Sequence, residues 1–211
     1  MSLFPIFLKL QDRPCLVIGA GEIADSKIHS LLTAGARVTV VSPEAKPGLV
    51  ALADAGRFQW HRRAYVESDL DGMFLVVAAT DQQEVNAAVY RDAVKRNVIC
   101  NAVDDPPNCD FYFPSVVRRG KLQVAISTAG ESPALAQQLR KEIDEQLPQD
   151  LGPWLDDLGE LRREVLAVIP AGKMRRLLLH ELAQRQVCGS DHCPSRQLVY
   201  EVASVSEKTH A

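Results

Sequence analysis

Two glycines near the start of the chain are the residues best suited to ligand chemistry. Gly19 ends the apolar run Cys15–Ile18 and Gly21 follows two positions later, so that with Ala24 the stretch reads G-x-G-x-x-A. Apolar residues then recur at helical spacing up to Gly35, which predicts a strand, a tight turn and a helix. In such a turn the first glycine permits the bend, the second lets the backbone approach a pyrophosphate, and the helix start binds its charge. The sequence therefore predicts a dinucleotide site, the alternative being the same turn without a ligand.

The residues after the next apolar run, Arg37–Val41, indicate which dinucleotide this would be. A typical NAD site has an acidic residue at the end of this strand, where it binds the ribose hydroxyls. Here Ser42 stands at that place, and the nearest acid, Glu44, lies beyond Pro43. No arginine follows directly, so a 2′-phosphate would lack an obvious partner, and NAD is favoured over NADP.

A pair of carboxylates, Asp104 and Asp105, follows another apolar run, Val98–Val103. If this run is a parallel strand, Asp104 lies at its carboxyl end, where open α/β sheets bind ligands. A carboxylate there could accept a proton as a general base. The same pair precedes Pro106 and Pro107, and Asp-Asp-Pro-Pro is also good turn chemistry. The residues alone leave both interpretations open.

A third candidate is the stretch Cys188-Gly189-Ser190-Asp191-His192-Cys193. Two thiols and an imidazole could bind Zn²⁺ or Fe²⁺. Structural zinc sites usually contain paired C-x-x-C units, and no second pair occurs in this chain. We therefore predict no metal site, and we expect these thiols to be peripheral to any chemistry.

The elements that must position these groups follow from the alternation of apolar runs and helical patterns in the first half of the chain. This alternation is typical of a doubly wound parallel sheet, so the sequence predicts an α/β fold that begins with a Rossmann-type domain. The expected strands after the first turn are residues 37–41, 58–60, 74–79 and 98–103, and the expected helices there are residues 44–56 and 83–96.

The pattern changes after residue 113. Residues 115–118 and 121–126 predict a β-hairpin, and Pro133 directly after Ser132 is a strong helix start. Leu135, Leu139 and Ile143 then form an apolar stripe that needs a partner surface. The predicted domains are an NAD-binding domain over 1–113, a dimerisation segment over 114–147, and a small all-helical domain over 148–211 with helices at 151–168 and 172–186 and a flexible tail.

Composition excludes several classes of function. The chain has 211 residues and a net charge of −3, which provides no general attraction to nucleic acid or to a membrane surface. No apolar run is long enough to span a bilayer, and the apolar start lacks the basic region and cleavage site of a signal peptide. The five cysteines are odd in number and scattered, which fits a reducing cytoplasm.

Several short motifs occur in family-like order and spacing over about residues 3–168. They are Phe4-Pro5-Ile6-Phe7, Val17-Ile18-Gly19-Ala20-Gly21-Glu22-Ile23-Ala24 with Lys27, Ala78-Ala79-Thr80-Asp81, Cys100-Asn101-Ala102-Val103-Asp104, Phe111-Tyr112-Phe113-Pro114-Ser115, and Ser132-Pro133-Ala134-Leu135-Ala136 with Leu139-Arg140. Together they resemble the precorrin-2 dehydrogenase / sirohydrochlorin ferrochelatase family, the first module of siroheme synthase. The methyltransferase module of the fused enzymes does not follow, so we expect a stand-alone form.

The resemblance implies a homodimeric enzyme that oxidises precorrin-2 to sirohydrochlorin by passing a hydride to NAD⁺, and in some members also inserts Fe²⁺ to make siroheme. It implies that the tetrapyrrole binds between the Rossmann domain and the dimerisation segment, and that the key carboxylate is Asp104. The expected cofactor contacts are Gly19, Gly21, Glu22, Ile23, Ala24, Ser42, Pro43, Glu44 and Thr80.

The substrate implied by this resemblance is a polyanion, so cations and a helix start should bind it. We expect Thr128, Arg118 and Arg140 to contact it. At least half of the cations near the proposed cleft should nevertheless be ordinary surface residues, and these cations are Arg118, Arg119, Lys121, Arg140 and Lys141. Two other functions stay open: a metallochelatase without dehydrogenase activity, and a Rossmann protein that senses NAD without chemistry. Binding of NAD⁺ together with formation of NADH from precorrin-2 distinguishes the three.

Overall fold

The structure, a computed structural model, describes residues 3–184, 186–188, 190 and 192–208. The chain divides into two compact units. The first runs as far as Phe113 and includes Ala129–Glu131, and the second comprises Pro114–Thr128 and the described residues from Ser132 onward. Each unit has its own buried cluster or clusters of apolar side chains, so each is described by itself.

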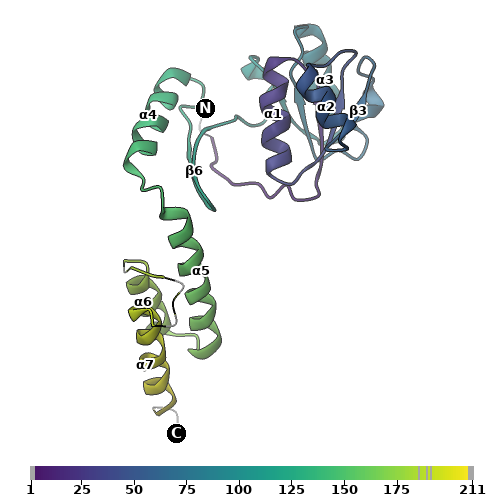
Figure 1. The fold of residues 1–211 in the computed structure, drawn as a ribbon. Coiled ribbons are helices and arrows are strands. Elements are labelled where there is room, and N and C mark those ends of the chain that lie inside the picture. The colour runs from purple at the N-terminus through teal and green to yellow at the C-terminus, as the bar shows by residue number, and fades with distance from the viewer. Residues whose placement is uncertain (1–2, 185, 189, 191, 209–211) are drawn as a thin grey trace. The chain divides into compact units, whose positions relative to one another are not determined.

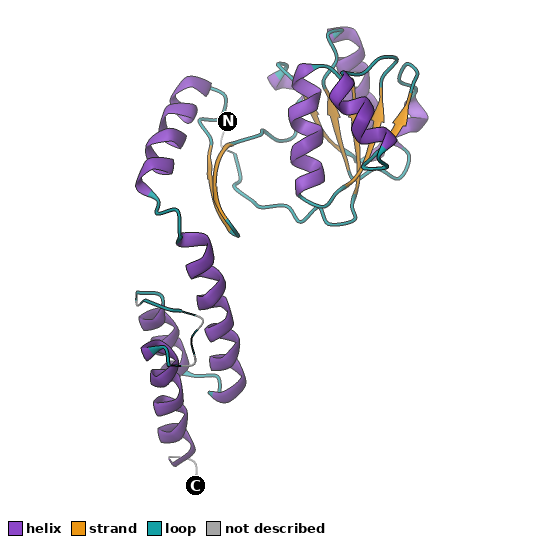
Figure 2. Cartoon of the chain, viewed as in Figure 1, coloured by secondary structure: helices purple, strands orange, loops and turns teal. Residues whose placement is uncertain are grey.

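The first unit is built on a five-stranded sheet with the strand order β3-β2-β1-β4-β5. All neighbouring strands are parallel, and Figure 2 shows them side by side with helices packed around them. Parallel strands that are covered on both faces are apolar along their whole length. β4 is an example, because all of its residues are apolar and buried. The strands are β1 (Pro14–Ile18), β2 (Arg37–Val41), β3 (Gln59–His61), β4 (Leu75–Ala78) and β5 (Ile99–Ala102).

Helices cover both faces of this sheet. Because side chains alternate along a strand, Cys15 and Val17 of β1 pack with Ile28 of α1 on one face. Leu16 of β1 packs with Val89 of α3 on the other. The prediction of a doubly wound Rossmann-type sheet is therefore confirmed. The helical elements are α1 (Glu22–Thr33), α2 (Pro47–Asp54), α3 (Gln83–Arg96) and the short 3₁₀ turns η1 (Glu67–Leu70) and η2 (Pro106–Asn108).

The second unit begins with the predicted hairpin and continues as helices (Figure 1). Its elements are β6 (Ser115–Arg119), β7 (Leu122–Ile126), α4 (Pro133–Gln146), α5 (Leu151–Val168), α6 (Lys173–Leu182) and α7 (Pro194–Lys208). The start of α4 is capped as the sequence predicts, because the Ser132 hydroxyl accepts a hydrogen bond from Leu135 N–H at 3.2 Å. Leu161, Leu182 and Val199 come from three different helices and form part of one buried cluster.

Three expectations differ from the structure. The helix expected over residues 44–56 begins only at Pro47. The residues before it are held in a loop, because Lys46 N–H donates to Ala20 O and the Ser42 hydroxyl donates to Glu44 O. The helix expected over residues 172–186 ends at Leu182. Where we expected a flexible tail, α7 forms instead, and it buries Val199 completely.

No helix in the described part of the chain has both the length and the apolar character needed to cross a membrane.

Candidate functional site

A cleft of about 460 Å³ lies in the first unit, where β1, β2 and β4 end. The carboxyl ends of parallel strands are where open α/β sheets bind ligands. Most of its lining comes from loops that directly follow these three strands. The lining residues are Ile18, Gly19, Ala20, Gly21, Val41, Ser42, Pro43, Ala64, Tyr65, Ala79, Thr80, Asp81, Gln82, Val85 and Ala88.

The two glycines of the first turn are required for different reasons. Gly19 has a φ of +102°, and a Cβ atom there would lie 2.4 Å from the Ala79 carbonyl oxygen, so packing and conformation both require glycine. Gly21 has an ordinary φ of −83°, and a Cβ atom there would meet no protein atom within 4 Å. Gly21 lines the cleft, and no side chain caps the start of α1. The open space beside helix N–H groups fits the pyrophosphate of a dinucleotide.

Thr80 lies beside the glycine turn, where a Cβ atom on Gly19 would come within 3.3 Å of its backbone nitrogen. It is held by the side chain of Asn86 in α3. The Asn86 carboxamide accepts from Thr80 N–H at 3.2 Å and donates to Thr80 O at 3.0 Å. The Thr80 hydroxyl also donates to Asn86 Oδ1 at 2.8 Å. Asn86 is only 3% exposed, so these hydrogen bonds satisfy a buried polar group and fix the loop that follows β4.

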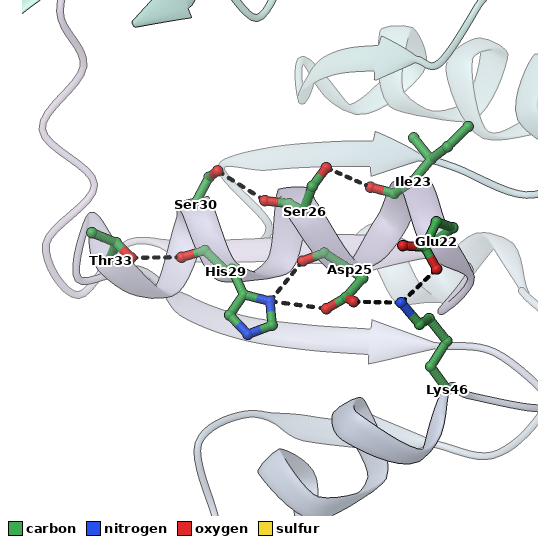
Figure 3. A network of polar contacts seen from close by, with 8 residues as sticks. All are labelled: Glu22, Ile23, Asp25, Ser26, His29, Ser30, Thr33 and Lys46. Carbon is green, nitrogen blue, oxygen red and sulfur yellow. Dashed lines mark hydrogen bonds and ion pairs between the residues drawn. The ribbon is translucent and has the colours of Figure 1, made fainter. Parts of the chain in front are cut away.

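A charged network surrounds the first turn of α1. The Lys46 ammonium lies 2.8 Å from the Asp25 carboxylate and 2.5 Å from that of Glu22, and His29 Nδ1 contacts Asp25 from the other side (Figure 3). The hydrogen bond from Lys46 lowers the pKa of Asp25. Two acids in the first turn stabilise a helix but would repel a pyrophosphate, and Lys46 compensates their charge.

The residues after β2 lie partly in the cleft and partly outside it. Ser42 and Pro43 line the cleft, and Ser42 is 8% exposed. The Ser42 hydroxyl donates to Glu44 O at 2.6 Å, and Trp60 Nε1 donates to Ser42 O at 3.0 Å, so this loop is held by its own polar groups. The Glu44 side chain is exposed and does not line the cleft.

Asp104 follows β5 and lies near Lys27 of α1. The backbone of Asp104 is left-handed, with a φ of +58°, and its side chain is exposed. Burial lowers the pKa of Lys27, and the neighbouring Asp104 carboxylate acts in the opposite direction. The Lys27 ammonium also lies 4.0 Å above the centre of the Phe113 ring. A carboxylate and a partly desolvated ammonium at the end of a parallel strand can exchange protons with a ligand.

Asp105 has a different role from Asp104. Its carboxylate accepts a hydrogen bond from the Asn108 side chain at 2.6 Å, and its carbonyl oxygen accepts from Asn108 N–H at 2.9 Å. These contacts close the turn η2. Of the two interpretations of the Asp-Asp pair, turn formation is therefore the one that fits Asp105.

The expected substrate residues belong to the second unit. The Thr128 hydroxyl accepts from Ser132 N–H at 3.2 Å, Arg118 is exposed on β6, and Arg140 lies 3.8 Å from Asp144. Arg119 is buried, and its guanidinium donates to Asp144 Oδ1 at 2.7 Å and to the carbonyl oxygen of Leu147 at 3.2 Å. Arg119 thus joins the hairpin to the end of α4.

The remaining sequence predictions divide by position. Gly19, Gly21, Ser42, Pro43 and Thr80 line the cleft. Ala24 belongs to the first turn of α1 and is fully buried in the apolar cluster that includes residues of β1, where its small side chain allows close packing. The side chains of Glu22 and Ile23 are exposed and do not line the cleft. Within the described residues, no three His, Cys, Asp or Glu side chains gather as a metal site.

Sequence reasoning missed Asn86 and Tyr65. Asn86 shares one helix face with the buried Val89 and Ala93, and a polar residue within such an apolar stripe was a signal of a specific partner. Tyr65 lines the cleft and donates to Asp92 at 3.1 Å. Burial and this hydrogen bond raise the pKa of Tyr65, and nothing in the local sequence distinguished it.

Comparison with known families covers most of the chain. Residues 6–115 match a family described as putative NAD(P)-binding, and residues 119–146 match one described as sirohaem biosynthesis protein central. A solved structure of SirC, a precorrin-2 dehydrogenase, superimposes with a TM-score of 0.75 at 26% identity and covers 98% of this chain and 100% of its own.

Two curated relatives illustrate the sequence similarity. Siroheme synthase of Methylobacillus flagellatus is 41% identical over 214 residues, which cover 100% of this chain and 46% of that protein. Siroheme synthase 1 of Aeromonas salmonicida is 46% identical over 167 residues, covering 79% of this chain and 36% of that protein. The chain thus spans less than half the length of these relatives.

Proposed function

The chain belongs to the family of precorrin-2 dehydrogenases, which also form the first module of siroheme synthases, and from this premise we propose that it oxidises precorrin-2 to sirohydrochlorin with NAD⁺. The observation that carries the proposal is the cleft of about 460 Å³. Gly21 lines this cleft, and there is open space where a Cβ atom on Gly21 would lie. Its position at the carboxyl ends of three parallel strands is the expected place for a dinucleotide.

The chemistry requires removal of a hydride and loss of a proton. Bound NAD⁺ supplies the hydride acceptor. Among the chain's own residues, Asp104 is our candidate for the group that accepts the proton, because it is exposed at the end of β5 and can donate it onward to solvent. The Lys27 side chain is the neighbouring cation. Burial has the larger effect and lowers the pKa of Lys27, and the Asp104 carboxylate acts to raise it.

The direct test is anaerobic incubation of the purified chain with precorrin-2 and NAD⁺. We expect NADH to form together with the absorbance spectrum of sirohydrochlorin. Binding of NAD⁺ without formation of NADH would contradict the proposal and would favour an NAD-sensing protein. Iron insertion into supplied sirohydrochlorin without any dehydrogenation would favour a chelatase.

We also propose a second activity, the insertion of Fe²⁺ into sirohydrochlorin. Metal insertion requires loss of the pyrrole protons, and a carboxylate such as Asp104 is suited to accept them. Addition of Fe²⁺ to the dehydrogenation mixture should then yield the spectrum of siroheme. Metal insertion at the rate seen without protein would contradict this part alone.

We propose that the chain forms a homodimer through its segment 114–147. The support comes from α4, where Leu135 remains 46% exposed and Leu139 and Ile143 are only partly buried within the chain. Such an apolar stripe is stabilised by a partner surface. Residues Arg118, Thr128 and Arg140 are proposed to bind the carboxylates of the tetrapyrrole.

A further inference from the structure

The connection between α6 and α7 brings two cysteines together in the second unit. Cys193 is 1% exposed, and its sulfur accepts a hydrogen bond from Cys188 N–H at 3.4 Å. Cys188 itself is exposed. Both line a cavity of about 540 Å³, whose wall also contains Trp154. Cys188 is thus exposed to solvent, and the buried sulfur of Cys193 contacts its backbone.

Cys193 occupies the start of α7. Its carbonyl oxygen accepts from Arg196 N–H at 2.9 Å and from Gln197 N–H at 3.1 Å, as at the first turn of a helix. Burial raises the pKa of the Cys193 thiol, but hydrogen bonds from Cys188 and from the N–H groups of Arg196 and Ser195 outweigh it and lower the pKa. A thiolate at a helix N-terminus is the nucleophilic form of cysteine.

The other described cysteines have the opposite character. Cys15 and Cys100 are fully buried in the sheet, and burial raises their pKa values to about 11 and about 12. Burial also raises the pKa of Cys109, whose sulfur donates to Ala102 O at 3.0 Å. Asp150 and Asp157 line the same cavity as Cys193. Cys193 differs from the three other thiols because hydrogen bonds from neighbouring groups outweigh the effect of burial and lower its pKa.

We propose that Cys188 and Cys193 are a thiol–disulfide exchange site, which a low-molecular-weight disulfide such as oxidised glutathione converts to an intramolecular disulfide. This inference is independent of the dehydrogenase activity. It rests on the short distance between the two residues, the exposure of one and the helix-start position of the other.

The exchange has two steps. The Cys188 thiolate attacks one sulfur of the external disulfide, forms a mixed disulfide and releases one equivalent of thiolate. The Cys193 thiolate then attacks the Cys188 sulfur and expels the second thiolate. The external disulfide is reduced to two thiols, the protein thiols are oxidised, and the two thiol protons pass to the released thiolates or to solvent. The new bond ties the connection before α7 to the start of that helix.

The test treats the full chain with oxidised glutathione at neutral pH, followed by alkylation and peptide mapping without reductant. We expect one cross-linked product that joins Cys188 to Cys193 and is lost on reduction. In the Cys193→Ser variant, the second step cannot occur, so a glutathione adduct on Cys188 should accumulate. In the Cys188→Ser variant, the buried Cys193 should acquire far less adduct in the same time.

A matched control and a second readout complete the design. Cys109→Ser should form the same cross-link as the parent chain, because this thiol takes no part. In a Trp60→Phe background, oxidation should change the fluorescence of Trp154, which lines the same cavity, and reduction should reverse the change. A stable glutathione adduct on Cys188 in the parent chain, or oxidation spread over Cys15, Cys100 and Cys109, would overturn the proposal.

Discussion

The Asn86 carboxamide forms hydrogen bonds with both the N–H and the carbonyl oxygen of Thr80, at 3.2 and 3.0 Å. A helix side chain thereby fixes the backbone of the loop that lines the cleft proposed to bind NAD⁺. The Asn86→Ala substitution should lower the free energy of unfolding by about 1–3 kcal/mol, because it leaves buried polar groups without partners. It should also weaken NAD⁺ binding. Urea denaturation and cofactor titration measure the two effects.

The Thr80→Val variant is the matched control for this prediction. It removes the hydrogen bonds of the Thr80 hydroxyl with Asn86 Oδ1 and with the Gln82 backbone, but it keeps both bonds between Asn86 and the Thr80 backbone. It should therefore weaken NAD⁺ binding less than Asn86→Ala does. If folded Asn86→Ala protein bound NAD⁺ as tightly as the parent, Asn86 would have no role in positioning the cleft.

The Gly21→Asp substitution should abolish NAD⁺ binding without unfolding the chain. A Cβ atom at position 21 meets no protein atom within 4 Å, so the new carboxylate would project into the cleft and repel the pyrophosphate. Gly48→Asp is the control, because position 48 is equally open and does not line the cleft. Calorimetric titration with NAD⁺ compares the two, and retained binding by Gly21→Asp would mean that the cofactor lies elsewhere.

The Asp104→Asn substitution should lower the rate of NADH formation from precorrin-2 by about 10²–10⁴-fold, the usual contribution of a positioned acid–base group. Asparagine tolerates the left-handed backbone at this position but cannot accept the proton. The affinity for NAD⁺ should change little. Anaerobic initial rates, with folding checked by circular dichroism, provide the measurement.

Two further variants separate catalysis from turn formation at this position. Asp104→Gly fits the φ of +58° without strain, so it should fold well and yet be as inactive as Asp104→Asn. Asp105→Asn should retain nearly parental rates, because Asp105 serves the turn through Asn108. Parental activity of Asp104→Gly, or a larger loss in Asp105→Asn, would show that the catalytic carboxylate is misassigned.

The ion pair between Lys46 and Asp25 should make stability depend on pH. Since the folded-state pKa of Asp25 lies below the ordinary value of 3.8, the ion pair stabilises the fold above that pH. Its contribution is lost as the pH falls through the lower folded-state value. The Lys46→Met variant should therefore lose less stability than the parent chain on acidification from about pH 5 to about pH 2. Denaturant titrations at a series of pH values test this, and equal slopes would refute it.

The Leu135→Lys substitution should shift the proposed dimer toward monomer, because it places a charge in the exposed part of the apolar stripe on α4. Val94→Lys is the matched control, since Val94 is 53% exposed on a helix of the first unit and should leave assembly unchanged. Sedimentation at micromolar concentration distinguishes the two. A monomeric parent chain, or equal masses for both variants, would count against dimerisation through α4.

The sequence was most informative where the structure depends on local pattern. The helix Gln83–Arg96 and the hairpin have close to the expected bounds, because periodicity and turn residues determine them. The roles of Asn86, Lys46 and Arg119 were not predictable, since each depends on partners that only tertiary packing supplies. Glu44 does not line the cleft. Its position was not predictable either, because the hydrogen bond from the Ser42 hydroxyl to its carbonyl oxygen forms only in the folded loop.

The central position of β1 has a consequence for how the chain folds during synthesis. Its neighbour β2 follows closely in the sequence, but its other neighbour β4 begins only at Leu75. At a translation rate of about 5–20 residues per second, β1 waits roughly 3–12 seconds for β4 to be made. Throughout this interval one edge of an almost wholly apolar strand has no hydrogen-bonded neighbour. The nascent first unit should therefore be a substrate for chaperones that bind exposed apolar segments, until β4 emerges and completes the centre of the sheet.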